Sequence, residues 1–85
     1  MAYYKQLSAD TIVKPSFGKL YSITISSTSS GTFAVYDGSS ASGVKMIDTI
    51  TPAAGATYFF PMGMQFDDGL FIDISNTIQL TVTFE

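Results

Sequence analysis

Hydrophobic and polar residues alternate with a period of two along most of the chain, which is the pattern of β-strands that bury one face. The clearest segment is TIQLTVTFE at 77–85, where one face carries Ile78, Leu80, Val82 and Phe84 and the other Gln79, Thr81 and Thr83. Further apolar faces predicted in this way are Tyr21, Ile23 and Ile25; Phe33 and Val35; Val44, Met46 and Ile50; and Leu70, Ile72 and Ile74. Helical periodicity is almost absent, so the pattern predicts an all-β protein.

Clusters of Gly, Ser, Asn, Asp and Pro separate these segments, at 26–31, 37–43, 51–56, 67–69 and 75–76. A further short strand is predicted at 10–14, ended by Pro15, which cannot donate to a strand ladder. Strands at intervals of about ten residues predict seven or eight strands in a small antiparallel β-sandwich of jelly-roll type, with a small β-barrel as the alternative. We expect residues 1–9 to form an N-terminal arm and residues 10–85 to form a single domain.

The loop YDGSSASG at 36–43 contains two glycines and an aspartate between two predicted strands. A phosphate-binding loop would open a helix, whereas a strand follows here, so we interpret the segment as a hairpin connection. Asp37-Gly38 and Asp68-Gly69 are dipeptides typical of tight turns, in which the aspartate caps its own backbone. The alternative for Asp67 and Asp68 is a calcium site, for which the sequence supplies no third nearby ligand.

Charge and composition exclude several classes of function. The chain has four lysines, seven carboxylates and a net charge of −3, and the lysines are scattered singly, which argues against nucleic-acid binding. No apolar run approaches the length of about 20 residues that spans a bilayer, and the first residues lack the apolar core of a signal peptide. We therefore expect no membrane partner, and synthesis in the cytoplasm without export by such a signal.

The chain contains no histidine and no cysteine. Ser-His-Asp and Cys-His arrangements cannot be built from it, and neither can a disulfide or an ordinary zinc or haem site. We expect no enzyme activity, no catalytic residue, no cofactor and no metal. Small domains without disulfides or metals are commonly stabilised by association, so we expect the 85-residue chain to work within an assembly.

The segment ATYFFPMGMQF at 56–66 is apolar on both faces, with Tyr58, Phe60 and Met62 alternating with Phe59 and Pro61. One interpretation is a central strand covered on both sides. The other is a strand whose second face meets another subunit, because aromatic residues and methionine are enriched in interface cores. The candidate contact residues are Tyr3, Tyr4, Phe60, Met62 and Met64.

Residues 21–84 resemble a family of short proteins encoded in tailed-bacteriophage genomes. The resemblance rests on a common frame: a strand, a Gly-Thr strand ending in aspartate, the DGSSASG turn, the segment ITPAAGATYFFP, the GLFI strand and a final strand. It implies a virion structural component of the capsid cement, or decoration, class.

Such proteins form homotrimers on the capsid exterior, where their partner is the major capsid protein. The resemblance therefore implies that this chain binds the outer surface of the head and stabilises the coat-protein shell. It transfers no catalytic or ligand-binding residue. The alternative function is an adhesin or carbohydrate-binding module on the tail or a fibre, which would read host glycans through exposed tyrosines and loop aspartates.

Overall fold

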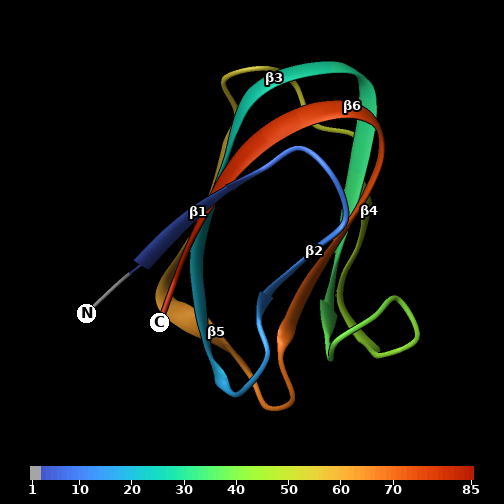
Figure 1. Ribbon diagram of the computed structural model, residues 1–85. Helices are drawn as coiled ribbons and strands as arrows, with labels where there is room; N and C mark the ends of the chain where they lie inside the picture. Colours follow the sequence, from blue (N-terminus) through green and yellow to red (C-terminus); the bar gives the residue numbers. More distant parts are fainter. Residues whose placement is uncertain (1–2) are drawn as a thin grey trace.

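The computed structural model describes residues 3–85 as six antiparallel β-strands without a helix (Figure 1). The strands are β1 (Tyr3–Leu7), β2 (Thr11–Lys14), β3 (Gly18–Asp37), β4 (Val44–Ile50), β5 (Thr57–Phe66) and β6 (Leu70–Phe84). Within these residues, no helix is long and apolar enough to cross a membrane. The prediction of an all-β protein is confirmed.

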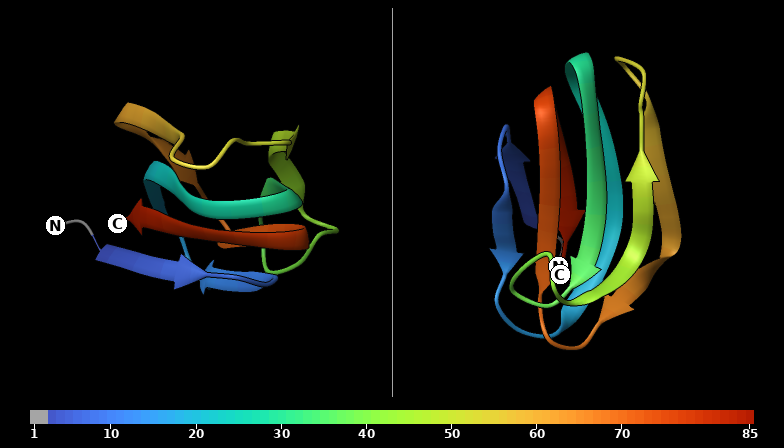
Figure 2. Two further views of the ribbon diagram at one scale, coloured as in Figure 1. Left: turned by 90° about the horizontal axis from the view of Figure 1, so that it is seen from above. Right: turned by 90° about the vertical axis from the view of Figure 1, so that its right-hand side faces the viewer.

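Two long strands, β3 and β6, pair with each other over almost their whole length, from Leu20 opposite Phe84 to Asp37 opposite Leu70. The paired ribbon arches over the top of the molecule and descends on both sides (Figure 1). β1 and β2 both pair with β6 at one edge of this ribbon, and β4 and β5 both pair with β3 at the other. Figure 2 shows this order from one edge to the other in both views.

The arch divides the sheet into two limbs, each four strands wide. The terminal limb consists of β1, residues 80–84 of β6, residues 18–24 of β3, and β5. The central limb consists of β2, residues 70–75 of β6, residues 32–37 of β3, and β4.

The crest of the arch explains why six strands are present where seven or eight were expected. The segments 26–31 and 75–76 were predicted as turns, but both lie within the β3–β6 pair, where residues 29–32 face residues 75–77, so the ladder bends there and continues. Ser30 and Asn76 take left-handed backbone conformations, with φ of 56° and 63°, and the Asn76 side-chain amide donates to the Ser30 carbonyl at 2.9 Å. Each long strand therefore spans two of the expected ones.

A single hydrophobic core contains residues from both limbs. Its buried members are Leu7, Val13, Leu20, Ile23, Ile25, Phe33, Val35, Phe66, Leu70, Ile72, Ile78, Leu80 and Val82. Phe33 from the central limb and Tyr58 from the terminal limb meet edge to face, with ring centroids 5.9 Å apart. The predicted inward positions on β6 are confirmed for Leu70, Ile72, Ile78, Leu80 and Val82.

Two positions depart from the predicted faces. The pairing register shifts between Leu20 and Ser22, so Leu20 takes the buried position expected for Tyr21. Tyr21 is half-buried, and its hydroxyl donates to Glu85 Oε1 at 3.0 Å. Val44 was predicted on the apolar face of its strand, but it is exposed at the start of β4.

Residues 3–7 of the segment expected to be an arm form β1, which pairs with β6 from Tyr3 opposite Phe84 to Leu7 opposite Leu80. Residues 1 and 2 lie outside the described residues. Leu7 is buried in the core, whereas Tyr3 and Tyr4 are exposed.

Candidate functional site

The most exposed apolar side chains of β5 lie on and beside a bulge. Among residues 3–85, β5 pairs with β3 alone, so its other edge is open. Two residue-to-residue steps along β3, from Leu20 to Ser22, correspond to five along β5, from Phe59 to Met64. The extra residues of β5 loop outward, and Gly63 allows this with a φ of 79°.

The bulge carries a continuous apolar surface. Met62 is 88% exposed and Phe59 is 68% exposed, while Phe60 and Met64 are half-buried and pack against the core. The segment 59–64 lines a shallow hollow of about 590 Å³. The prediction that one face of this segment packs inward agrees with the structure, and its other face is open to solvent.

The five candidate contact residues fall on two opposite edges of the terminal limb. Phe60, Met62 and Met64 belong to β5, and Tyr3 and Tyr4 belong to β1, with β6 and β3 between these strands. The Tyr3 ring lies 6.1 Å from the ring of Phe84. Phe59 was not among the candidates, although alternation placed it on the face opposite Tyr58.

The hairpin prediction for residues 36–43 agrees with the structure, in which Asp37 pairs with Val44 and Ser40 accepts from the Gly43 N–H at 3.1 Å. The role predicted for Asp37 was wrong, because its carboxylate does not cap its own turn. It accepts the backbone N–H groups of Asp67 at 3.0 Å, Asp68 at 2.8 Å and Gly69 at 3.4 Å.

This contact joins the two Asp-Gly turns, and the Gly38 N–H also donates to the Gly69 carbonyl at 3.0 Å. The N–H of Asp67 contributes most to lowering the pKa of the Asp37 carboxyl, and the N–H groups of Asp68 and Gly69 act in the same direction. Asp37 thus ties the β3–β4 loop to the β5–β6 turn.

The calcium alternative at Asp67 and Asp68 finds no third ligand. Within residues 3–85, no group of three acidic side chains could hold a metal ion. Asp67 Oδ1 accepts from the Gln65 side-chain amide at 3.3 Å, and the backbone of both aspartates faces Asp37. These contacts account for the turn at 67–69 as a structural element.

The segment between β1 and β2 is joined to β6 by Asp10, whose carboxylate lies beside that of Asp73. Asp10 Oδ1 accepts from the Ile74 N–H at 2.7 Å, and Asp73 lies beside Asp10. Burial raises the pKa of Asp73, and the neighbouring Asp10 raises it further by charge and hydrogen bonding, while Lys45 opposes this shift.

We expect Asp73→Asn to stabilise the protein at pH 7 by less than about 1 kcal/mol, because the site is largely screened by solvent. A carboxyl with a raised pKa in the folded state contributes its full stability below the unfolded-state pKa and loses it as pH rises through the raised value. Urea unfolding should therefore show a gain at pH 7 and none near pH 3. Asp48→Asn is the control, since Lys45 pairs with Asp48 at 3.1 Å and the substitution should bring no gain. Equal gains for Asp73→Asn at both pH values would contradict the explanation.

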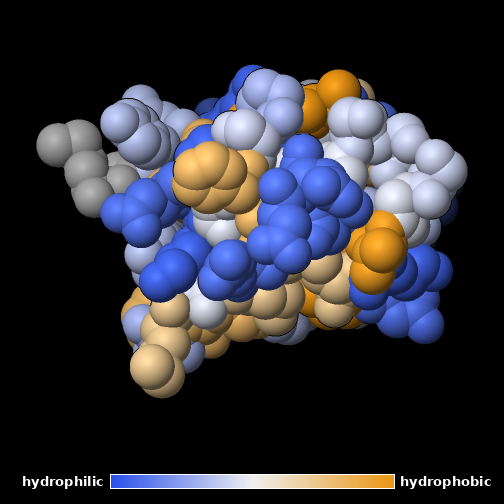
Figure 3. Space-filling model, turned by 90° about the horizontal axis from the view of Figure 1, so that it is seen from below, coloured by the Kyte–Doolittle hydropathy of each residue, from blue (hydrophilic) through white to orange (hydrophobic). Residues whose placement is uncertain are grey.

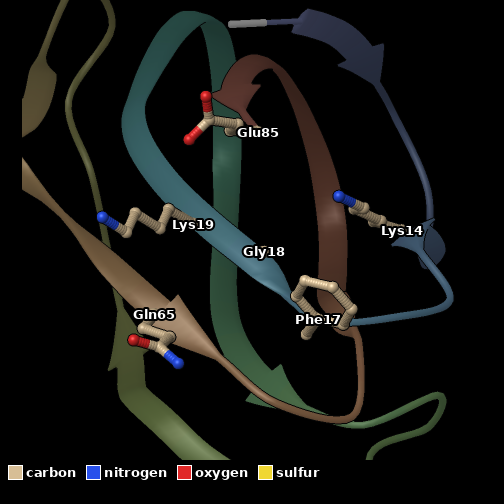
Figure 4. A pocket seen from close by; sticks show the side chains of 6 residues that line it. All are labelled: Lys14, Phe17, Gly18, Lys19, Gln65 and Glu85. Carbon is tan, nitrogen blue, oxygen red and sulfur yellow. The ribbon is translucent and has the colours of Figure 1, made fainter. Parts of the chain in front are cut away.

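A separate hollow of about 320 Å³, shown from close by in Figure 4, lies beside the β2–β3 turn, at the end of the molecule that is lowest in Figure 1. Its lining residues come from β2, the β2–β3 turn, β3, β5 and the C-terminal end: Lys14, Phe17, Gly18, Lys19, Gln65 and Glu85. The Lys14 ammonium lies 5.9 Å from the Phe17 ring centroid. The side chains around the hollow are two lysines, a glutamate, a glutamine and one aromatic ring. Seen from below, polar side chains separate the apolar patches of this end (Figure 3).

Comparison of the chain with protein-family models, curated proteins and solved structures finds no significant match in any of the three.

Proposed function

We propose that this chain is a decoration protein of a tailed bacteriophage, which binds the capsid exterior and uses the apolar bulge of β5 as a docking surface. The supporting observation is the 88% exposure of Met62 on a bulge that projects from an open sheet edge. The sequence resemblance over residues 21–84 supplies the class of partner, the coat protein of the head. The proposal assigns no catalytic residue, cofactor or metal.

The chemistry of the bulge suits side-chain docking better than strand pairing. Pro61 has no backbone N–H, and a bulge takes the edge out of the flat geometry that another strand would need. Methionine adapts to irregular surfaces, and aromatic residues are enriched where interfaces exclude water. A partner would therefore meet Met62 and its neighbours through apolar contact.

We further infer that the two facing limbs form a jelly-roll-like sandwich, the compact form expected from the sequence, and that three copies associate on the shell. A homotrimer that contacts several coat subunits at once gains affinity from linked binding events. Because the trimer would bind only the assembled shell, it would stabilise that shell by mass action.

We expect Met62→Ser to weaken binding to expanded empty heads by about tenfold or more per site, because it removes most of the apolar area offered by one side chain. Co-sedimentation of the purified protein with heads of the phage that encodes it measures this. Val44→Ser is the matched control, since Val44 is also exposed but lies on β4 of the central limb. Light scattering gives the oligomeric state.

The proposal fails if the wild-type protein is strictly monomeric and does not bind the heads. It also fails in its choice of surface if Met62→Ser binds as well as wild type. Electron micrographs that place the protein on the tail or a fibre would support the alternative, a host-attachment module.

A further inference from the structure

The outer face of the terminal limb carries a regular array of hydroxyl and aromatic side chains. Residues 4–6, 81–83, 22–24 and 57–59 pair across four strands without a register shift. Two rows of outward side chains result: Tyr4, Thr83, Ser22 and Phe59 in one, and Gln6, Thr81, Thr24 and Thr57 in the other. Between these rows on the two central strands, Ile23 and Val82 are buried, so the rows face away from the core.

An exposed aromatic ring stands at each end of the first row. Tyr4 is 77% exposed and Phe59 is 68% exposed. Ser22 and Thr83 lie between them with their hydroxyl oxygens 2.6 Å apart. Because these two side chains are short, the middle of the row projects less from the sheet than its aromatic ends. Three inter-strand steps of about 4.8 Å separate the two aromatic positions, so they are roughly 14 Å apart.

The two rows contain no charged side chain. Their hydroxyl and amide groups can both donate and accept hydrogen bonds, and their aromatic rings present flat apolar faces. A ligand that matches these groups is itself uncharged, rich in hydroxyl groups, and flat on one side. Sugar rings combine these properties, because their hydroxyl groups point outward and their C–H faces stack on aromatic rings.

We propose that this face binds a neutral, extended oligosaccharide that lies across the strands and stacks on Tyr4 and Phe59. A single sugar ring cannot reach both aromatic residues, so the site requires a chain of several units. Because Tyr4 and Phe59 lie in one row across the four strands, the site favours a straight, ribbon-like chain, such as a β-1,4-linked glycan, over a coiled one. The inference does not rest on the decoration role, because it uses the outer face of the limb and does not need Met62. Phe59 is the one residue that this face shares with the bulge surface.

The test is isothermal titration calorimetry of the full chain with cellohexaose, xylohexaose and chitohexaose as straight probes, maltohexaose as the coiled probe, and glucose as the single unit. Wild type should bind at least one straight hexasaccharide, and should bind glucose and maltohexaose far more weakly. Tyr4→Ala and Phe59→Ala should each weaken that binding about five- to tenfold. Both side chains are exposed, so unchanged thermal unfolding should accompany the loss.

Phe17→Ala is the matched control, because Phe17 is 72% exposed but lies outside the two rows, on the β2–β3 turn. It should bind like wild type, and so should Met62→Ser. The inference is overturned if no straight hexasaccharide binds, if maltohexaose binds as tightly, or if Phe17→Ala loses as much affinity as Tyr4→Ala. Sugar binding without loss in Tyr4→Ala and Phe59→Ala would also overturn it.

Discussion

We expect Phe33→Ala to destabilise the protein by about 3–5 kcal/mol, the usual cost of removing a buried aromatic side chain. Phe33 is 1% exposed, and it reaches from the central limb to the Tyr58 ring of the terminal limb. An 85-residue domain has a total stability of about 4–13 kcal/mol at the typical value per residue. The substitution would therefore remove a large share of the protein's free energy of unfolding.

Urea unfolding followed by circular dichroism measures this loss. Phe17→Ala removes the same side chain from an exposed position and should stay within about 0.5 kcal/mol of wild type. Phe33→Leu refills part of the space and should recover a substantial part of the stability. A loss below about 1 kcal/mol for Phe33→Ala would mean that the limbs do not pack on each other through this residue.

The inward faces of the strands could be predicted because side chains alternate between the two faces of a strand. In a long alternating segment, all the apolar residues must then share one face. On β6, Leu80 and Val82 had to share a face, and both are buried. The division into strands was less predictable. Serine, glycine and asparagine suit both a turn that ends a strand and a bend within paired strands. Only the alignment of residues 29–32 with residues 75–77 across the sheet selects the bend, and this alignment is a long-range property.

The bulge has a sequence signal of its own beyond the alternation of apolar residues. Pro61 and Gly63 both interrupt regular strand pairing, and together they indicate an edge strand with an irregularity. This context favours exposure of part of the segment over burial on both faces. It does not identify the partner, so the docking role of Met62 and of the β1 tyrosines stays a prediction.

The partner of Asp37 was out of reach of local reasoning, because the N–H groups that it accepts lie about 30 residues further along the chain. Turn preferences describe what an aspartate does with its own backbone. Here the β3–β6 pairing brings the ends of two different hairpins together, with Asp37 opposite Leu70. The carboxylate then meets a set of backbone donors that no local pattern reveals.

We expect Asp37→Asn to destabilise the protein by about 1–2 kcal/mol at pH 7. Hydrogen bonds to a charged acceptor are worth more than neutral ones, and this site is partly screened by solvent. The substitution keeps the shape of the side chain but turns one acceptor oxygen into an NH₂ group that faces backbone donors. Asp67→Asn is the control, because it changes a neighbouring exposed carboxylate and leaves the backbone N–H of the turn in place.

The pH dependence of the stability loss in Asp37→Asn distinguishes the contribution of the Asp37 charge from that of the side-chain shape. The N–H groups of the 67–69 turn lower the pKa of folded Asp37, so its contribution is complete above the unfolded-state value and is lost as pH falls through the lower folded value. The stability difference between wild type and Asp37→Asn should be full at pH 7 and should shrink as the pH falls below about 4. An unchanged difference at pH 2.5 would contradict a charge-based contact. Faster amide hydrogen exchange at Asp68 in the variant would place the loss at the turn, because this N–H makes the shortest of the hydrogen bonds that Asp37 accepts.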